Sequence, residues 1–249
     1  MVVPKYSKEA IVRRFDGAAE NYDQNATVQS QIAHHLADIV IRKTPQPPAA
    51  ILDIGCGTGF VAEAVIERWP RADLTAVDSS LAMLRQAKRK LPHLRAVAGD
   101  ITAMEFGPEF DLILSSMALH WLAEPQAAIK RWQRWLKPGG RLFVAFLVAG
   151  SFAEWRDLCI SQGVSDSLWP LPPADFAGVA AVIERRAIET VHSSARDFLH
   201  SLKAMGGATP KPGHKPIPVS AMRRLLRAAP KPFTASYNVL YLEMTLPSV

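Results

Sequence analysis

The sequence predicts an α/β fold: a seven-stranded, mostly parallel sheet with helices on both faces and an antiparallel last strand. Two observations predict it. From residue 50 to residue 148, short apolar runs alternate with stretches of helical period, which is typical of parallel strands joined by helices. Two more strand-like runs follow within residues 182–246, which raises the expected number of strands from five to seven.

A helical arm is expected to precede the sheet, over residues 1–49. Within it, apolar residues recur at helical spacing across residues 27–43, and a shorter helix is expected at residues 7–15. The proline-rich stretch 44–49 ends the arm, because proline cannot continue a helix. Residues 50–249 then form the main domain.

The first part of the main domain is expected to form the parallel strands. Strands are expected at residues 50–55, 72–78, 94–100, 110–117 and 141–148, and helices at 59–69, 79–91 and 125–136. The motif "KPGG" is expected to close the last of these helices, because glycine commonly follows a helix end.

The second part is less regular, and we expect a helical insertion on the substrate side at about residues 150–220. Helices are expected at 151–162, 194–206 and 219–229, a long loop at 206–218, and strands at 182–192 and 236–246. The two strands complete the sheet.

The amino-acid composition limits the classes of protein to which this chain could belong. Hydrophobic residues make up 49% and charged residues 21% of the chain, which is ordinary for a soluble globular protein. No apolar run approaches the roughly 20 residues that span a bilayer, and the N-terminus becomes charged too early for a signal peptide. Cys56 and Cys159 form no metal-binding spacing. We expect a cytoplasmic protein without a metal or a membrane span.

The net charge of +6 makes an acidic partner plausible, either nucleic acid or an acidic protein. Scattered lysines and arginines that only keep the chain soluble are the alternative interpretation.

Three glycines lie where the first strand turns into a helix. Gly55, Gly57 and Gly59 allow positive φ angles and let a ligand approach bare backbone, and the helix that follows presents unpaired N–H groups. The dinucleotide-binding motif has its third glycine one residue later. The loop therefore predicts a ligand site of a related but different kind.

Acidic residues lie at the ends of the first three strands or just after them, at the edge where parallel sheets bind ligands. Asp53 would repel a diphosphate and favours a cationic ligand. Asp78 is placed to accept hydrogen bonds from two ribose hydroxyls, and Asp100 from an exocyclic amine, with Ile101 against a purine. S-adenosylmethionine combines all of these groups.

The motifs "LDIGCGTG", "AVD" and "AGDI" resemble those of the class I S-adenosylmethionine-dependent methyltransferases over residues 50–148. The resemblance implies a Rossmann-like fold and S-adenosylmethionine as cofactor. The expected cofactor-binding residues are Asp53, Gly55, Cys56, Gly57, Gly59, Asp78, Ser79, Met83, Asp100, Ile101 and Ser116. Cys56 is expected to be a small residue that fits there rather than a nucleophile.

The flanking segments are similar to the biotin-pathway methyltransferases that act on malonyl-[acyl-carrier protein], the BioC family. That family's N-terminal pattern is matched by Phe15, Ala18, Ala19, Tyr22, Ala26 and Gln29. "LVAGSFAEW" and "SLKAMGGATP" are similar too, the latter with one extra glycine. The resemblance implies methylation of the free carboxylate of a malonyl thioester on an acidic carrier protein, early in biotin synthesis.

Three residues are candidates for handling the acceptor. Tyr22 is expected to close over the cofactor, with a core aromatic as the alternative. His120 is either a base or a residue that packs over the cofactor with Trp121, and Lys203 is a candidate to orient the carboxylate. A carboxylate that is already ionised at neutral pH needs no general base.

Two basic clusters are candidates for docking the carrier protein: Arg131, Arg134 and Lys137, or Arg223, Arg224 and Arg227. We expect a monomer that binds no nucleic acid. The alternatives are a methyltransferase of a small carboxylic acid, such as trans-aconitate, or of a quinone precursor, an RNA-binding methylase, and a cofactor-binding protein without catalysis.

Overall fold

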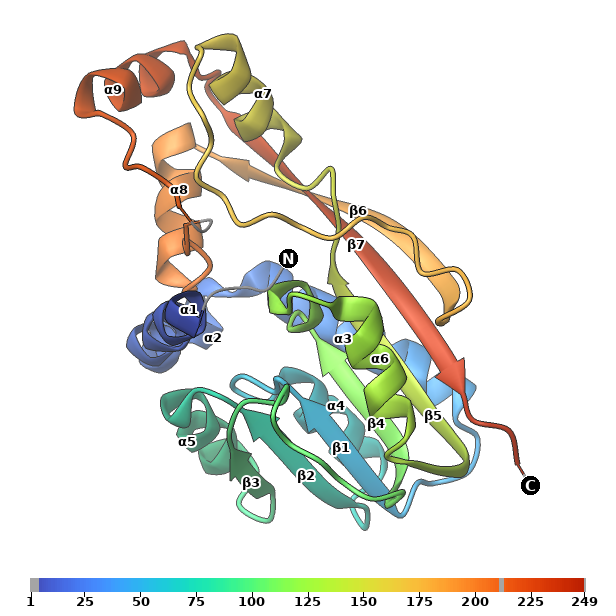
Figure 1. Cartoon of the computed structure of the whole chain (residues 1–249). Coiled ribbons are helices and arrows are strands. Elements are labelled where there is room, and N and C mark those ends of the chain that lie inside the picture. The colour runs from blue at the N-terminus through green and yellow to red at the C-terminus, as the bar shows by residue number, and fades with distance from the viewer. Residues whose placement is uncertain (1–4, 211–212, 249) are drawn as a thin grey trace.

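The computed structural model describes residues 5–210 and 213–248, and its centre is one seven-stranded sheet (Figure 1). The strand order is β3-β2-β1-β4-β5-β7-β6. Neighbours from β3 to β5 are parallel, whereas β7 runs antiparallel to both β5 and β6. The predicted fold class is confirmed.

The strands follow the predicted order along the chain. They are β1 (Ala50–Ile54), β2 (Asp73–Asp78), β3 (Arg95–Ala98), β4 (Phe110–Ser116), β5 (Leu136–Leu147), β6 (Ala181–His192) and β7 (Phe233–Thr245). The central strands are buried on both faces, which explains why they are continuous apolar runs rather than alternating ones.

Helices cover both faces of the sheet. They are α1 (Lys5–Ala18), α2 (Tyr22–Asn25), α3 (Thr27–Lys43), α4 (Phe60–Arg68), α5 (Leu81–Lys90), α6 (Pro125–Gln133), α7 (Ala153–Ser161), α8 (Ala195–Ala204) and α9 (Val219–Ala228), with short 3₁₀ turns at Ala19–Asn21 and Leu119–Trp121. In Figure 1, α6 lies in front of the sheet and α3 and α4 lie behind it.

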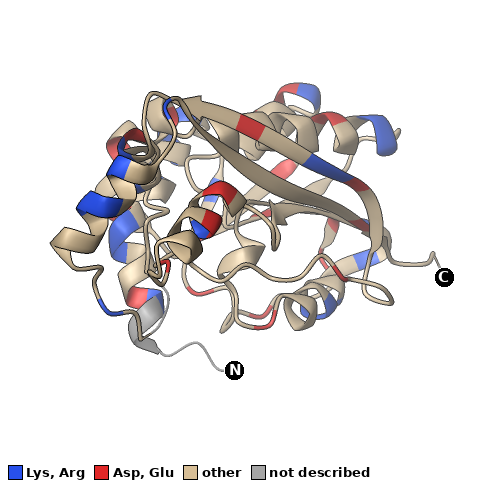
Figure 2. Cartoon of the chain, turned by 90° about the horizontal axis from the view of Figure 1, so that it is seen from above, with Lys and Arg blue, Asp and Glu red and all other residues tan. Residues whose placement is uncertain are grey.

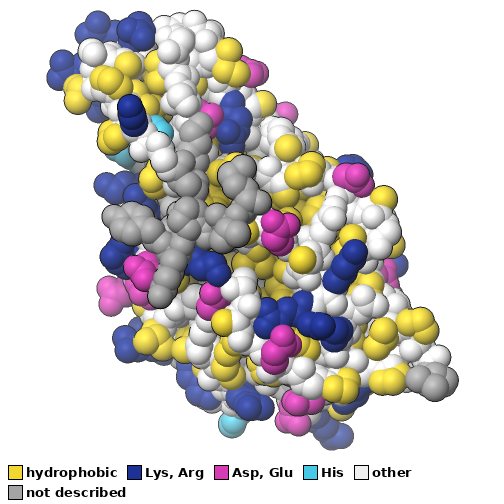
Figure 3. Space-filling model, in the orientation of Figure 1, with side chains coloured by type: hydrophobic (Ala, Val, Ile, Leu, Met, Phe, Trp, Pro, Cys, Tyr) yellow, Lys and Arg dark blue, Asp and Glu magenta, His cyan; other side chains and the backbone are white. Residues whose placement is uncertain are grey.

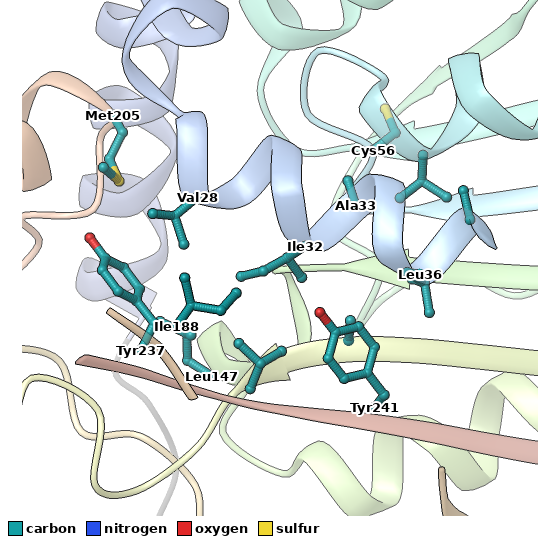
Figure 4. Packing of buried hydrophobic residues seen from close by; sticks show 14 of the residues in the cluster. Val28, Ile32, Ala33, Leu36, Cys56, Leu147, Ile188, Met205, Tyr237 and Tyr241 are labelled. Carbon is teal, nitrogen blue, oxygen red and sulfur yellow. The ribbon is translucent and has the colours of Figure 1, made fainter. Parts of the chain in front are cut away.

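Two hydrophobic clusters hold these layers together. One joins α3, α4 and α5 to the sheet, and Figure 4 shows its part around Ile32 and Leu36 of α3, which pack toward Tyr241 of β7. The other joins Ile129 and Trp132 of α6 to the opposite face. Full burial of side chains of this size is worth about 1.5–3 kcal/mol each, so α3, although it belongs to the arm, is part of the core.

The boundary between α6 and β5 differs from the prediction. Helix α6 ends at Gln133, and "KPGG" lies inside β5 rather than closing the helix. Leu136 is buried and pairs with Phe110 across an irregularity in the ladder, and Gly139, with φ of +77°, permits the bend. Leu136 is therefore extended because it pairs with Phe110, although its local sequence favours a helix.

The arm and the second half of the chain meet above the carboxyl ends of the parallel strands. Helices α7, α8 and α9 lie beyond that edge, and α1 and α2 lie between α8 and the sheet (Figure 1). In the part of the chain described here, none of the helices has the length and apolar character needed to cross a membrane.

Candidate cofactor and acceptor site

A cavity of about 660 Å³ lies at the carboxyl ends of the parallel strands, beneath α1. Most of the predicted cofactor-binding residues line it: Asp53, Gly55, Cys56, Gly57, Asp78, Ser79, Met83, Asp100, Ile101 and Ser116. Gly59 does not line the cavity. It has a left-handed conformation, with φ of +89°, at the start of α4, where it shapes the loop.

The glycine loop has the conformation that its sequence predicts. Gly55 and Gly57 both have positive φ angles, of +66° and +54°. A Cβ atom on Gly55 would lie 2.3 Å from the Cβ of Ala118, so no larger residue fits there. A Cβ atom on Gly57 would meet nothing within 4 Å. The backbone at Gly57 is thus open to a ligand.

Asp53 is a buried carboxylate without a hydrogen-bond partner in the described residues. Its side chain is 1% exposed, and neither oxygen accepts a hydrogen bond. Burial, together with the nearby charge of Asp78, raises the pKa of Asp53 to about 7. Because a buried unpaired charge is costly, this arrangement fits a cationic ligand that would pair with Asp53.

Asp78 supports the glycine loop. Its carboxylate accepts hydrogen bonds from the backbone N–H groups of Gly57, at 2.9 Å, and Ser80, at 2.8 Å. Burial raises the pKa of Asp78, and these hydrogen bonds oppose the shift. Asp78 also lines the cavity, next to the region that the predicted ribose would occupy.

Asp100 has a partner that the sequence did not indicate. Its carboxylate accepts a hydrogen bond from Lys8 of α1 at 2.9 Å, and it also accepts hydrogen bonds from the backbone and hydroxyl of Thr102. Partial burial works against the charged form, but the bonds from Lys8 and Thr102 outweigh it and lower the pKa of Asp100. Lys8 and Asp100 are 92 residues apart, so no local pattern joins them.

Polar contacts hold the arm over the cavity. Asp16 accepts a hydrogen bond from the Ser80 hydroxyl at 2.6 Å. Asp23 accepts one from the Thr58 hydroxyl at 2.5 Å and pairs with Lys90 at 2.5 Å. These contacts join the arm to the loop and to the helices that carry the predicted cofactor site.

Tyr22 lies between the arm and the core. Its ring packs at 6.4 Å from Phe15 and at 6.2 Å from Phe60, measured between ring centroids. Burial, with the nearby charges of Asp78 and Asp23, raises the pKa of Tyr22 far above its ordinary value, so its hydroxyl stays protonated. Tyr22 lines the cavity while it packs in an aromatic cluster.

A second, smaller cavity of about 60 Å³ adjoins the first. Its lining is largely aromatic and apolar and includes Leu147, Phe152, Trp169, Leu202 and Tyr237. Five residues line both cavities: Phe15, Tyr22, Gln29, Met117 and Trp121. We refer to these five as the junction. In the sequence, Gln29 stands out only as part of the family pattern.

His120 and Lys203, the other two acceptor candidates, lie in different surroundings. His120 lines the second cavity, is 5% exposed, and has no partner for Nδ1 among the described residues. Burial lowers the pKa of His120 to about 3, so the imidazole is neutral. Lys203 is exposed on α8 and lines neither cavity, so the structure does not bring it to the site.

Comparisons with known proteins agree with this geometry. A family model described as "Methyltransferase domain" matches residues 51–140. The chain is 33% identical over 246 residues to a malonyl-[acyl-carrier protein] O-methyltransferase of Magnetococcus marinus, covering 90% of this chain and 88% of that protein. The chain belongs to the malonyl-[acyl-carrier protein] O-methyltransferase family. The predicted family, cofactor and enzyme class are confirmed: this is an S-adenosylmethionine-dependent methyltransferase.

Two further comparisons concern a longer relative and a solved structure with a similar fold. The chain is 35% identical over 234 residues to the biotin biosynthesis bifunctional protein BioCD of Bordetella avium. The match covers 91% of this chain but only 50% of that longer protein. The solved structure of the YcgJ protein of Bacillus subtilis has a TM-score of 0.60 at 15% identity, covering 87% of this chain and 100% of that chain. The latter supports the fold alone.

The two basic clusters of the methyltransferase differ in their surroundings. Arg131 donates to the backbone oxygens of Thr102 and Met104, and Lys137 pairs with Asp111 at 3.1 Å. Arg131 and Lys137 are therefore engaged within the chain.

The cluster on α9 is more available. Arg223, Arg224 and Arg227 are exposed, and none of them pairs with a carboxylate in the described part of the chain. Arg224 donates to the backbone oxygen of Gln162, at 3.2 Å. In Figure 3, dark blue side chains gather at the upper end of the molecule, where Figure 1 places α9.

Proposed function

We propose that this methyltransferase converts the free carboxyl group of malonyl-[acyl-carrier protein] to its methyl ester, in an early step of biotin synthesis. The observation that carries the proposal is the junction, where the larger cavity, which holds the acidic residues of the predicted cofactor site, adjoins a smaller apolar recess. Family membership across most of the chain supports the choice of acceptor.

The residues of the larger cavity suit the parts of S-adenosylmethionine. Asp53 and the loop from Gly55 to Gly59 would hold the methionine end, because Asp53 lacks a counter-charge and Gly57 leaves the backbone open. Asp78 would hold the ribose, and Asp100 with Ile101 the adenine. When bound, S-adenosylmethionine would supply a methyl carbon on a positively charged sulfur for transfer to an oxygen of the acceptor carboxylate, with S-adenosylhomocysteine as the leaving group.

In this proposal the protein contributes position and the exclusion of water rather than a base. The acceptor carboxylate is ionised at neutral pH, and both it and the sulfonium lose charge during transfer, so strong solvation would slow the reaction. The arm, with Tyr22 at its centre, would close over the two cavities and keep water out. The segment 150–220 supplies much of the acceptor side, including Trp169 and Leu202.

The carrier protein would dock near α9. Between Asp197 and Glu243 the sequence has no acidic residue. It contains seven cations there: Lys203, Lys211, Lys215, Arg223, Arg224, Arg227 and Lys231. Figure 2 shows Lys and Arg positions along the helices at the left of the view from above. A segment whose charged residues are all positive attracts an acidic carrier protein and speeds the encounter.

We also infer a cytoplasmic monomer whose partner is a protein rather than a nucleic acid. Nucleic-acid surfaces combine cations with exposed aromatic side chains on which bases stack. Among the described residues, the exposed large hydrophobic side chains are all aliphatic: Leu81, Ile160, Val182, Val191 and Val219. The positive charge is therefore better matched to a carrier protein.

The test is methyl transfer from labelled S-adenosylmethionine to malonyl-carrier protein and to free malonate. We expect transfer to the carrier-bound group and little transfer to free malonate. A second candidate, methylation of a small carboxylic acid, is favoured by the small size of the second cavity, about 60 Å³. Equal rates on both acceptors would overturn the first proposal and support the second.

A further inference from the structure

Gln29 is a polar side chain at the junction of the two cavities. It lies in the first turn of α3, is 8% exposed, and lines both the larger and the smaller cavity. The preceding residue, Val28, and the contact residue on the facing segment, Met205, are both apolar and are labelled in Figure 4. A polar group at this depth normally has hydrogen-bond partners within the protein.

The Gln29 amide is poorly satisfied by its own chain. Its Nε2 lies 2.8 Å from the sulfur of Met205, and a thioether is a weak acceptor. Its Oε1 has no partner in the described residues. A buried amide in this state contributes little to the stability of the fold, because strong hydrogen bonds do not offset the cost of removing it from water. The position therefore points to a ligand that supplies the missing partner.

The types of side chain that line the second cavity indicate what kind of ligand would bind Gln29. Among the described residues that line it, none is Lys, Arg, Asp or Glu. The polar side-chain groups at the junction are the Tyr22 hydroxyl, the Trp121 indole N–H and the Gln29 amide, all neutral. An amide can turn about its last side-chain bond to present its N–H groups to an anion. A neutral donor orients a carboxylate while leaving it less stabilised than an ion pair would.

We propose that the Gln29 amide binds the acceptor carboxylate at the junction, in the role for which Lys203 was a candidate. This inference rests on the proposed function, since it takes the acceptor to be a carboxylate. Gln29 orients one carboxylate oxygen by an N–H hydrogen bond, and the other oxygen is left to react. The carboxylate is thus recognised in an apolar recess without a counter-ion.

The experiment compares Gln29→Met with a matched control, Gln31→Met. Methionine keeps the length of the side chain and favours a helix. Gln31 is exposed on the same helix two residues away. For each variant, we would measure methyl transfer to malonyl-carrier protein, binding of S-adenosylhomocysteine by calorimetry, and thermal unfolding. Inhibition by butanoyl-carrier protein, whose acyl group is similar in size to malonyl but uncharged, would be measured in parallel.

We expect Gln29→Met to lower kcat/KM for malonyl-carrier protein by about 10- to 100-fold, the effect of losing a hydrogen bond to a charged group. Inhibition by butanoyl-carrier protein and affinity for S-adenosylhomocysteine should change less than about twofold, because neither depends on that bond. Gln31→Met should behave as the unmodified chain.

Either of two results would overturn the inference. One is a kcat/KM for Gln29→Met within about twofold of the unmodified enzyme. The other is a parallel loss of malonyl- and butanoyl-carrier binding with a lower melting temperature, which indicates a packing role. Failure of the proposed function is distinguishable, because the unmodified enzyme would then not methylate malonyl-carrier protein at all.

Discussion

The carboxylate of Asp78 accepts a hydrogen bond from the backbone N–H of Gly57 at 2.9 Å. The acid at the end of β2 thus holds the glycine loop that follows β1, in addition to its proposed contact with the ribose. With that proposed contact, a single side chain would link the shape of the loop to the recognition of the cofactor.

The first prediction concerns this link. Asp78→Ala should weaken S-adenosylhomocysteine binding by about 1–3 kcal/mol, because the loop N–H and the ligand hydroxyls lose their acceptor. Calorimetry measures this affinity. Asp73→Ala, at the exposed start of the same strand, is the control and should bind normally. Unchanged affinity in Asp78→Ala would remove the proposed ribose contact.

The second prediction concerns pH and Asp53. Its pKa is raised from the ordinary 3.8 to about 7, so between these values the folded chain holds a proton that the unfolded chain has lost. The contribution of Asp53 to stability is therefore present at low pH and is lost as pH rises through about 7. A cationic ligand selects the ionised form, so its affinity should rise from about pH 5.5 to about pH 7.5.

Asp53→Asn tests this assignment. The variant without ligand should be about 1–3 kcal/mol more stable at neutral pH, because no charge is buried, and its S-adenosylmethionine affinity should be weak and nearly independent of pH. Thermal unfolding and calorimetry at several pH values measure both quantities. A pH dependence of binding equal to that of the unmodified enzyme would assign the titration to another group.

The third prediction concerns the contacts of the arm. Asp23→Ala removes the hydrogen bond from Thr58 and the ion pair with Lys90. The arm should open more often, so S-adenosylhomocysteine should dissociate about 5- to 10-fold faster, as expected for a loss of about 1 kcal/mol. Stopped-flow fluorescence measures the rate. Glu20→Ala, exposed on the same arm, is the control, and equal rates in the two variants would contradict the closing role.

The fourth prediction separates the two basic clusters. Reversing charge on α9 with Arg223→Glu and Arg227→Glu together should lower kcat/KM for malonyl-carrier protein by about 10-fold or more, through slower association. Turnover of a small malonyl thioester that lacks the carrier protein should not change. Arg134→Glu tests the other cluster and should have little effect. The reverse pattern would place docking at α6.

The sheet could be predicted because each parallel strand is a short apolar run next to a clear helical period. Asp53, Asp78 and Asp100 could be located for the same reason, since each lies at the end of such a run or just after it. Boundaries that depend on distant pairing could not be predicted in this way. Leu136 looks like the end of a helix but pairs with Phe110 in the sheet.

The missed features have the same cause. Lys8 contacts Asp100 across 92 residues, and Gln29 meets Met205 across 176 residues. Neither contact leaves a local pattern. Conversely, Lys203 belongs to a motif that resembles the family, but the turn of α8 on which it lies directs it to solvent, away from both cavities.

Phe15, Tyr22 and Gln29 all come from the arm and its first core helix, and each forms part of the wall of both cavities. The two cavities therefore share one wall. An acyl chain bound in the smaller cavity would hold that wall in place and keep S-adenosylhomocysteine in the larger cavity. Turnover should then be ordered, with the methyl ester departing before the nucleoside is exchanged.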